Sequence, residues 1–90
     1  MNREMVLDTA KEYIMNDRAA THGNAEDSFA AIAALWSAYI GEDISPVDVA
    51  AMMILLKTAR IKANPRHDDN WVDIAGYAAC GSDVAANYER

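Results

Sequence analysis

The sequence predicts an all-α fold in which residues 1–90 form one compact domain of four helices. Hydrophobic residues make up 52% of the chain, and alanine and methionine, which favour helix over strand, supply much of that share. Apolar residues also recur at the three- and four-residue spacing of helices. Each of these periodic segments is flanked by residues that commonly begin or end helices, so four helices can be placed in order.

The first two helices are defined mainly by their ends. The first is expected from Asn2 to Asp17, with Asn2 as the N-cap. The second is expected to begin at Asn24, another good N-cap, with acidic residues in its first turn. Gly41 should end it, because glycine is common just past the last helical residue.

The third helix has the clearest start signal and the most apolar body. Ser45, Pro46 and Asp48 supply a capping serine, a proline at the first helical position and an acid three residues after the cap. The run from Val49 to Leu56 is apolar on every side, which is typical of an enclosed helix. Three other short helices could barely enclose it, so we expect a homo-oligomer that packs through this helix before it ends at Asn64.

The fourth helix is expected to start near Asn70 and to end near Asn87. Gly76 and Gly81 lie inside it at a cost of roughly 1 kcal/mol each against alanine, which indicates that another helix or a ligand approaches the backbone there. Its predicted inner face consists of Trp71, Ile74, Ala75, Ala78 and Ala85.

Charge and composition exclude several classes of protein. A net charge of −6 argues against general nucleic-acid binding and against binding to a membrane surface, but it leaves room for a small anion in a local basic pocket. The single cysteine, Cys80, can form neither an internal disulfide nor a cysteine zinc site. No secretory signal core or membrane-spanning run is evident, so we expect a cytoplasmic protein.

Charged residues concentrate around the junction of the third and fourth helices. Four of the eight basic residues fall within positions 57–66. Lys57 and Arg60 share a helix face, and Asp69 and Asp73 would point the same way if both are helical. Cations that capture phosphate beside carboxylates that accept ribose or base hydrogens predict a nucleotide pocket. The full ligand-binding set adds a loop arginine and histidine and two aromatic residues for base stacking, and comprises Arg18, His22, Lys57, Arg60, Asp69, Trp71, Asp73 and Tyr77.

Two other interpretations of these residues stay open. In a purely structural one, Lys57 or Arg60 forms an ion pair with Asp73, and Asn70 caps the fourth helix. In a catalytic one, Mg²⁺ is held by a carboxylate set that consists of Glu26, Asp27 and Asp73. No P-loop, dinucleotide fingerprint or nucleophile elbow is present, so the sequence favours binding without catalysis and without a cofactor.

Four segments carry a resemblance to a known family. They run through Arg18-x3-His22-Gly23-Asn24-x-Glu26-Asp27-x-Phe29, Ile32 to Trp36, Met53-x3-Lys57-x2-Arg60, and Asp69 to Ala78. Together, over about residues 15 to 82, they resemble short proteins of unknown function encoded by tailed bacteriophages and prophages. The resemblance implies a protein that acts in the cytoplasm of an infected bacterium.

More distantly, the layout is similar to the all-α nucleotide pyrophosphohydrolases of the MazG and dimeric dUTPase type. Those oligomeric enzymes hold magnesium with a Glu-x-x-Glu pair and a Glu-x-x-Asp pair. Here Glu26 and Asp27 are adjacent, and Asn70 stands where the second pair, ending at Asp73, would have its glutamate.

The combined expectation is a phage-encoded nucleotide-binding protein, with sequestration of a nucleotide second messenger of host anti-phage defence as its expected role. The alternative is a magnesium-dependent pyrophosphohydrolase of reduced form, and a third is a protein-binding module with an acidic surface. The expected partners are a nucleotide or cyclic nucleotide and further copies of the chain, with no membrane and no general nucleic-acid binding.

Overall fold

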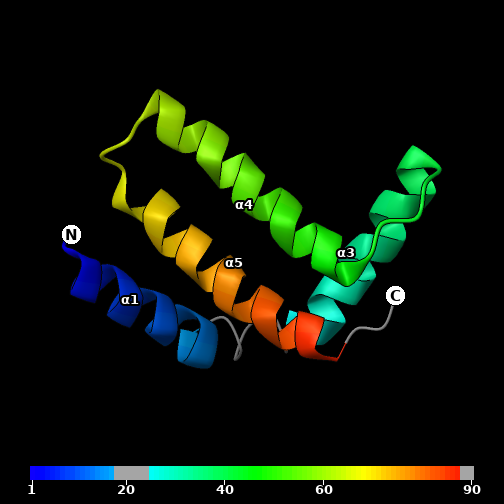
Figure 1. The fold of residues 1–90 in the computed structure, drawn as a ribbon, viewed down its shortest axis with the longest axis horizontal. Helices are drawn as coiled ribbons and strands as arrows, with labels where there is room; N and C mark the ends of the chain where they lie inside the picture. The colour runs from blue at the N-terminus through cyan, green and yellow to red at the C-terminus, as the bar shows by residue number, and fades with distance from the viewer. Residues whose placement is uncertain (18–24, 88–90) are drawn as a thin grey trace.

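The structure, a computed structural model, describes residues 1–17 and 25–87, apart from the side chains of Asp17 and Glu26. Within these residues it contains four α-helices and one π-helical turn and no strand, which confirms the predicted all-α fold (Figure 1). None of the described helices is long and apolar enough to cross a membrane. The elements are α1 (Arg3–Glu12), the π-helical turn η1 (Tyr13–Asp17), α3 (Ala25–Ile40), α4 (Pro46–Ala63) and α5 (Asp68–Ala86).

The last helix, α5, organises the molecule. It runs between α1 on one side and α4 on the other, and α4 and α5 form an antiparallel hairpin (Figure 1). α3 crosses the far end of this hairpin, contacts both of its helices, and projects away from them toward its own C-terminal end. α5 therefore contacts every other α-helix, and any site on it is shaped by its neighbours.

The helix boundaries follow the predicted caps at three places. The side chain of Asn2 accepts a hydrogen bond from the backbone N–H of Met5 at 2.9 Å. Ser45 and Asp48 form a reciprocal capping box, with both bonds at 3.0 Å. Gly41, at φ 81°, ends α3 in the left-handed conformation that glycine adopts without strain.

Two boundaries differ from the prediction. The first helix is α-helical only to Glu12, and η1 follows it. The fourth helix begins at Asp68, two residues before the predicted Asn70, with His67 at the cap position and no side-chain capping bond. Asp68 and Asp69 in the first turn suit the positive end of the helix dipole, so an earlier start is favourable. The predicted capping role of Asn70 is therefore wrong.

The hydrophobic core is small and lies where α3, α4 and α5 meet. Its buried members are Phe29, Ala33, Val49, Ala50 and Val84, with seven half-buried apolar residues packed around them. The predicted enclosure of α4 is not met by the described part of this chain. Its buried residues lie on one side, whereas large apolar residues on the other side, Met52, Leu55 and Leu56, are exposed.

Both glycines of α5 mark close helix contacts, as predicted. A Cβ atom on Gly81 would lie 3.0 Å from the Cβ of Ala50 on α4, and one on Gly76 would lie 3.2 Å from Cγ2 of Ile14. The predicted inner face of α5 is wrong in part. Trp71, Ala78 and Ala85 are exposed, and the buried residues are Asn70, Val72, Gly76 and Val84. The neighbouring elements approach α5 closely at Gly76 and Gly81, because these residues have no side chain in the way.

Candidate functional site

The charged residues of the α4–α5 hairpin meet at one point. Lys57 Nζ lies 2.8 Å from Asp73 Oδ2, and the two side chains are only 12% and 11% exposed. The antiparallel register that brings Gly81 against Ala50 also brings residue 73 opposite residue 57. One cation and one acid from the predicted pocket therefore converge, in the pairing that the structural interpretation also foresaw.

Asn70 lies one helical turn before Asp73, and its environment is unusual. The residue is 5% exposed, yet its side chain makes no hydrogen bond within the described part of the chain. No side-chain nitrogen or oxygen of the described residues is both sealed from solvent and unpartnered, so the Asn70 amide still reaches water. Buried polar groups are normally satisfied by a protein partner or by water, and for the Asn70 amide the described residues leave that place to water or to a ligand.

We call Lys57, Asn70 and Asp73 the polar seam. The Lys57 ammonium has three N–H donors, of which the bond to Asp73 uses one. The carboxylate offers acceptors on both oxygens, and the Asn70 amide offers a donor and an acceptor. The polar seam therefore presents a cation from α4 together with an anion and a neutral amide from neighbouring turns of α5. All three side chains are largely shielded from bulk water.

Other predicted ligand residues lie outside the seam. Arg60 is exposed on the last turns of α4. Asp69 is exposed as well, and its Oδ2 lies 3.9 Å from His67 Nε2. Asp69 therefore takes no part in the buried contact that Asp73 makes with Lys57. Arg18 and His22 lie outside the described residues.

The two predicted aromatic residues have different environments. Tyr77 is half-buried and packs on the core, with its ring centroid 6.3 Å from that of Phe29. Trp71 is 45% exposed, and its Nε1 donates a hydrogen bond to the Pro65 carbonyl at 2.9 Å. Of these two aromatic residues, only Trp71 has a ring exposed at the surface, where a ligand could reach it.

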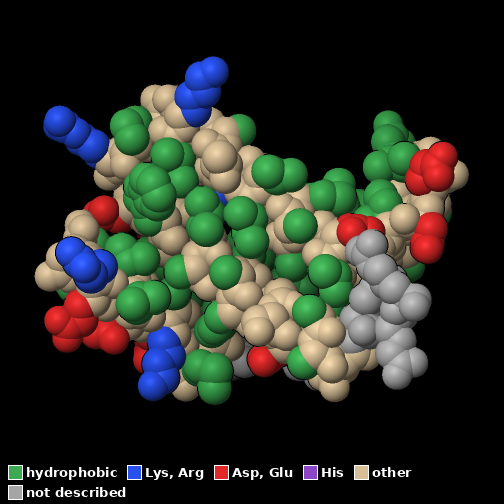
Figure 2. Space-filling view, in the orientation of Figure 1, with side chains coloured by type: hydrophobic (Ala, Val, Ile, Leu, Met, Phe, Trp, Pro, Cys, Tyr) green, Lys and Arg blue, Asp and Glu red, His purple; other side chains and the backbone are tan. Residues whose placement is uncertain are grey.

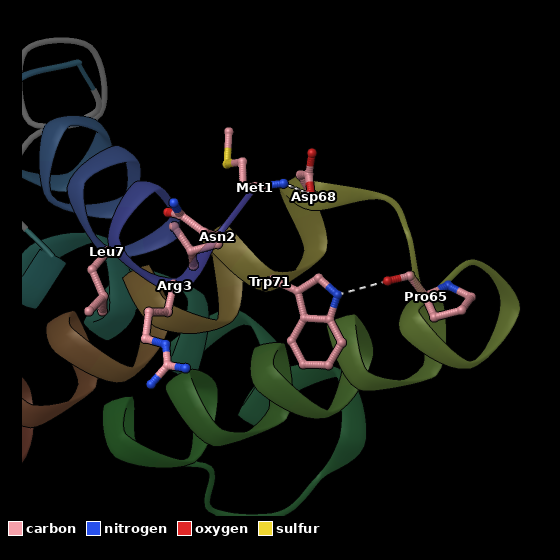
Figure 3. Close-up of a pocket in the computed structure, with 8 residues that line it drawn as sticks. Met1, Asn2, Arg3, Leu7, Pro65, Asp68 and Trp71 are labelled. Atoms are coloured by element: carbon pink, nitrogen blue, oxygen red, sulfur yellow. Dashed lines mark hydrogen bonds and ion pairs between the residues drawn. The ribbon is translucent and has the colours of Figure 1, made fainter.

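Trp71 also lines an open hollow of about 510 Å³ between the starts of α1 and α5 (Figure 3). Across it the N-terminal ammonium of Met1 lies 3.1 Å from Asp68 Oδ1. Arg3 lines the same hollow, and its side chain extends away from the ammonium of Met1 (Figure 3). The lining residues are Met1, Asn2, Arg3, Val6, Leu7, Pro65, Asp68 and Trp71.

The magnesium set of the hydrolase alternative is not assembled in what the structure describes. Asp27 is exposed, and the side chain of Glu26 lies outside the described residues. No three His, Cys, Asp or Glu residues in the described part of the chain are grouped so that they could hold a metal ion.

Sequence reasoning missed two features of these sites. It treated Asn70 as a helix cap, and nothing in its local sequence distinguishes a cap from a buried amide one turn inside the helix. It also left out Arg3 and Asp68, which lie 65 residues apart in the chain and meet only because α1 packs along α5.

Comparison with known proteins places the chain among phage proteins. Residues 5–85 match the family described as a domain of unknown function, DUF6378. The Gene 55 protein of Mycobacterium phage L5 is 51% identical over 74 residues, which cover 81% of this chain and 47% of that protein. The Gene 55 protein of Mycobacterium phage D29 is 42% identical over 77 residues, or 86% of this chain and 51% of that protein.

The chain thus spans about half the length of the curated relatives it matches. No solved structure matches it.

Proposed function

We propose that this chain, which belongs to the DUF6378 family of phage-encoded domains, is a nucleotide-binding protein that acts in the cytoplasm of the infected bacterium. The observation that carries the proposal is the polar seam, above all the buried Asn70 amide, which makes no hydrogen bond to the described residues and lies one turn from Asp73 of the Lys57–Asp73 pair. The proposed biological role is sequestration of a nucleotide second messenger used in anti-phage defence.

The chemistry of the seam suits a nucleotide. A phosphate would take the free N–H groups of Lys57, and a carboxylate such as Asp73 would accept hydrogen bonds from ribose hydroxyls. The Asn70 amide would pair with a base edge or a hydroxyl group that presents both a donor and an acceptor. A ligand would thereby supply the hydrogen bonds that the described protein does not give Asn70.

The proposal includes self-association. α4 carries large apolar side chains on the side that its own chain leaves uncovered, and these give the protein a surface for another copy. Such oligomers often place ligand sites next to subunit contacts, and Lys57 lies on the helix that carries this surface.

Isothermal titration calorimetry against cyclic mononucleotides, cyclic dinucleotides and ADP-ribose derivatives tests the binding proposal. We expect at least one of these compounds to bind tighter than about 100 μM. Asn70→Leu should weaken that binding at least about tenfold, since a buried hydrogen bond contributes about 1–1.5 kcal/mol. Lys57→Met should weaken it by a similar factor or more.

Lys11→Met is the matched control, because Lys11 is exposed on α1 and lies outside both the seam and α4. It should change the affinity less than about twofold, the effect of one distant, screened charge. The proposal fails if no compound binds below the threshold, or if the three variants bind alike. Release of phosphate or pyrophosphate in a parallel assay with magnesium would replace sequestration with hydrolysis.

A further inference from the structure

Large apolar side chains are left uncovered on both α3 and α4 of the described structure. Tyr39 is 93% exposed, Leu35 is 70% exposed and Leu55 is 67% exposed. Leu35 and Tyr39 are four residues apart on α3, and Met52, Leu55 and Leu56 are three or four apart on α4, so each set occupies one side of its helix. We call these five residues the α3–α4 apolar face.

The surface around this face has the shape and composition of an interface. Figure 2 shows hydrophobic side chains over α4 and at the projecting end of α3, with a notch in the outline between them. From Ser28 to Ile40, α3 carries no charged residue, and α4 carries none from Val49 to Leu56. Monomeric proteins rarely expose apolar patches of this extent.

We infer that a second copy of this chain covers the α3–α4 apolar face, in a twofold dimer in which the α4 helices run antiparallel. This inference deepens the proposed self-association and is independent of nucleotide binding. Its support comes from the charges that border the face, from the area that the face offers and from the small size of the core.

The charges at the two ends of α4 are self-complementary. Glu42 and Asp43 are exposed just before the helix, and Arg60 and Lys62 are exposed on its last turns. A twofold axis across the middle of α4 would bring the acidic end of each copy beside the basic end of the other. The same surface suits a membrane poorly, since interfacial helices flank their apolar side with cations and the acidic end here would repel anionic lipids.

The area is also of the size that a dimer needs. If a fully exposed large side chain offers about 150–250 Å², the exposed fractions of the five residues amount to roughly 500–700 Å². Exposed alanines between them extend this surface toward the ~800 Å² that each partner contributes to an interface of standard size.

The core of one chain is correspondingly small. Only Val49 and Val72 are fully buried among its large side chains, whereas eleven large hydrophobic residues are exposed in the described structure. A chain of this length is marginal alone, and burying the face against a second copy would extend the core across the twofold axis.

Sedimentation equilibrium of the chain without any nucleotide tests the inference. We expect a monomer–dimer equilibrium, and Leu55→Glu should raise its dissociation constant more than about tenfold, because a buried carboxylate would replace an apolar contact. Met5→Glu is the matched control, since Met5 is 51% exposed on α1, away from the face, and its variant should dimerise like the original. Circular dichroism checks that both variants keep their helices.

A second pair of variants tests the antiparallel orientation. Lys62→Glu should weaken the dimer several-fold, since it would place an acid beside Glu42 and Asp43 of the other copy, whereas Lys11→Glu on α1 should not. Equal effects of these two variants would overturn the antiparallel arrangement.

A chain that remains monomeric up to roughly 100 μM would overturn the dimer, as would a dimer that Leu55→Glu leaves intact or that Met5→Glu disrupts equally. Any of these results would leave the calorimetric test of nucleotide binding unaffected, so the two proposals fail separately.

Discussion

At the scale of single residues, neighbouring positions on α5 have very different environments. Asp69 and Asp73 are four residues apart, yet their side chains are 61% and 11% exposed. Asp69 lies in the first turn of α5, whereas Asp73 lies one turn further along the helix, where Lys57 of α4 covers it. Asn70, by contrast, stays on the buried side without gaining a hydrogen bond.

A prediction at this scale compares Asn70 and Lys57. Asn70→Leu should raise the free energy of unfolding by about 1 kcal/mol, because an apolar side chain of similar size replaces a buried amide that makes no hydrogen bond. Lys57→Met should lower it by about 2 kcal/mol, because the Asp73 carboxylate loses its ammonium partner in a largely buried place. Urea denaturation monitored by circular dichroism measures both values. A clear loss of stability in Asn70→Leu would instead show that the amide has a structural role.

At the scale of helices, the α4–α5 and α1–α5 contacts depend on small residues in different ways. At Gly81, an added methyl group would meet the Cβ of Ala50, which moves only with the α4 backbone. At Gly76, it would meet the Cγ2 methyl group of Ile14 in η1 at 3.2 Å, so Ile14 would need to shift by only a few tenths of an ångström. The two glycines therefore have the same intrinsic cost in a helix but different tolerance to alanine.

The corresponding prediction uses each glycine as the control for the other. Gly81→Ala should lower the free energy of unfolding by about 1 kcal/mol, because separating the helices costs more than the roughly 1 kcal/mol gained in helix propensity. Gly76→Ala should be neutral or stabilising by about 0.5 kcal/mol. Chemical denaturation of the two variants under identical conditions measures the difference. Equal changes in the free energy of unfolding would mean that both contacts accommodate an added methyl group equally well.

At the scale of the whole molecule, the arrangement is more open than a domain of this size requires. The radius of gyration is 13.6 Å, against about 12 Å for a compact domain of 90 residues. The projecting end of α3 accounts for part of this difference (Figure 1). An open shape with a small core and an uncovered apolar face fits a subunit that completes its core on association.

If the chain completes its core on association, its thermal stability should depend on protein concentration. If unfolding accompanies dissociation, a tenfold increase in concentration should raise Tm by about 3–5 °C for a domain of this size. Differential scanning calorimetry over a range of concentrations measures the shift. The Leu55→Glu variant should have a lower Tm that no longer changes with concentration, and a constant Tm in both proteins would contradict coupled association.

Local chemistry along the chain was enough to place most helix ends and to identify the fold class. The capping signals of Asn2, Ser45 and Gly41 act within one turn, so their effect can be predicted from neighbouring residues. The family resemblance was likewise carried by motifs that are contiguous in sequence, and the match over residues 5–85 confirms the phage-encoded family. The similarity to MazG-type enzymes stays a prediction.

Tertiary packing decided which side of each helix is buried. Lys57 pairs with Asp73 because the register of the hairpin places them opposite each other, and that register depends on small residues such as Gly81 and Ala50. Burial of the Asn70 amide and exposure of Leu55 also depend on where neighbouring helices lie. Periodicity in a chain rich in alanine leaves several faces nearly equivalent, and only the contacts between helices select one of them.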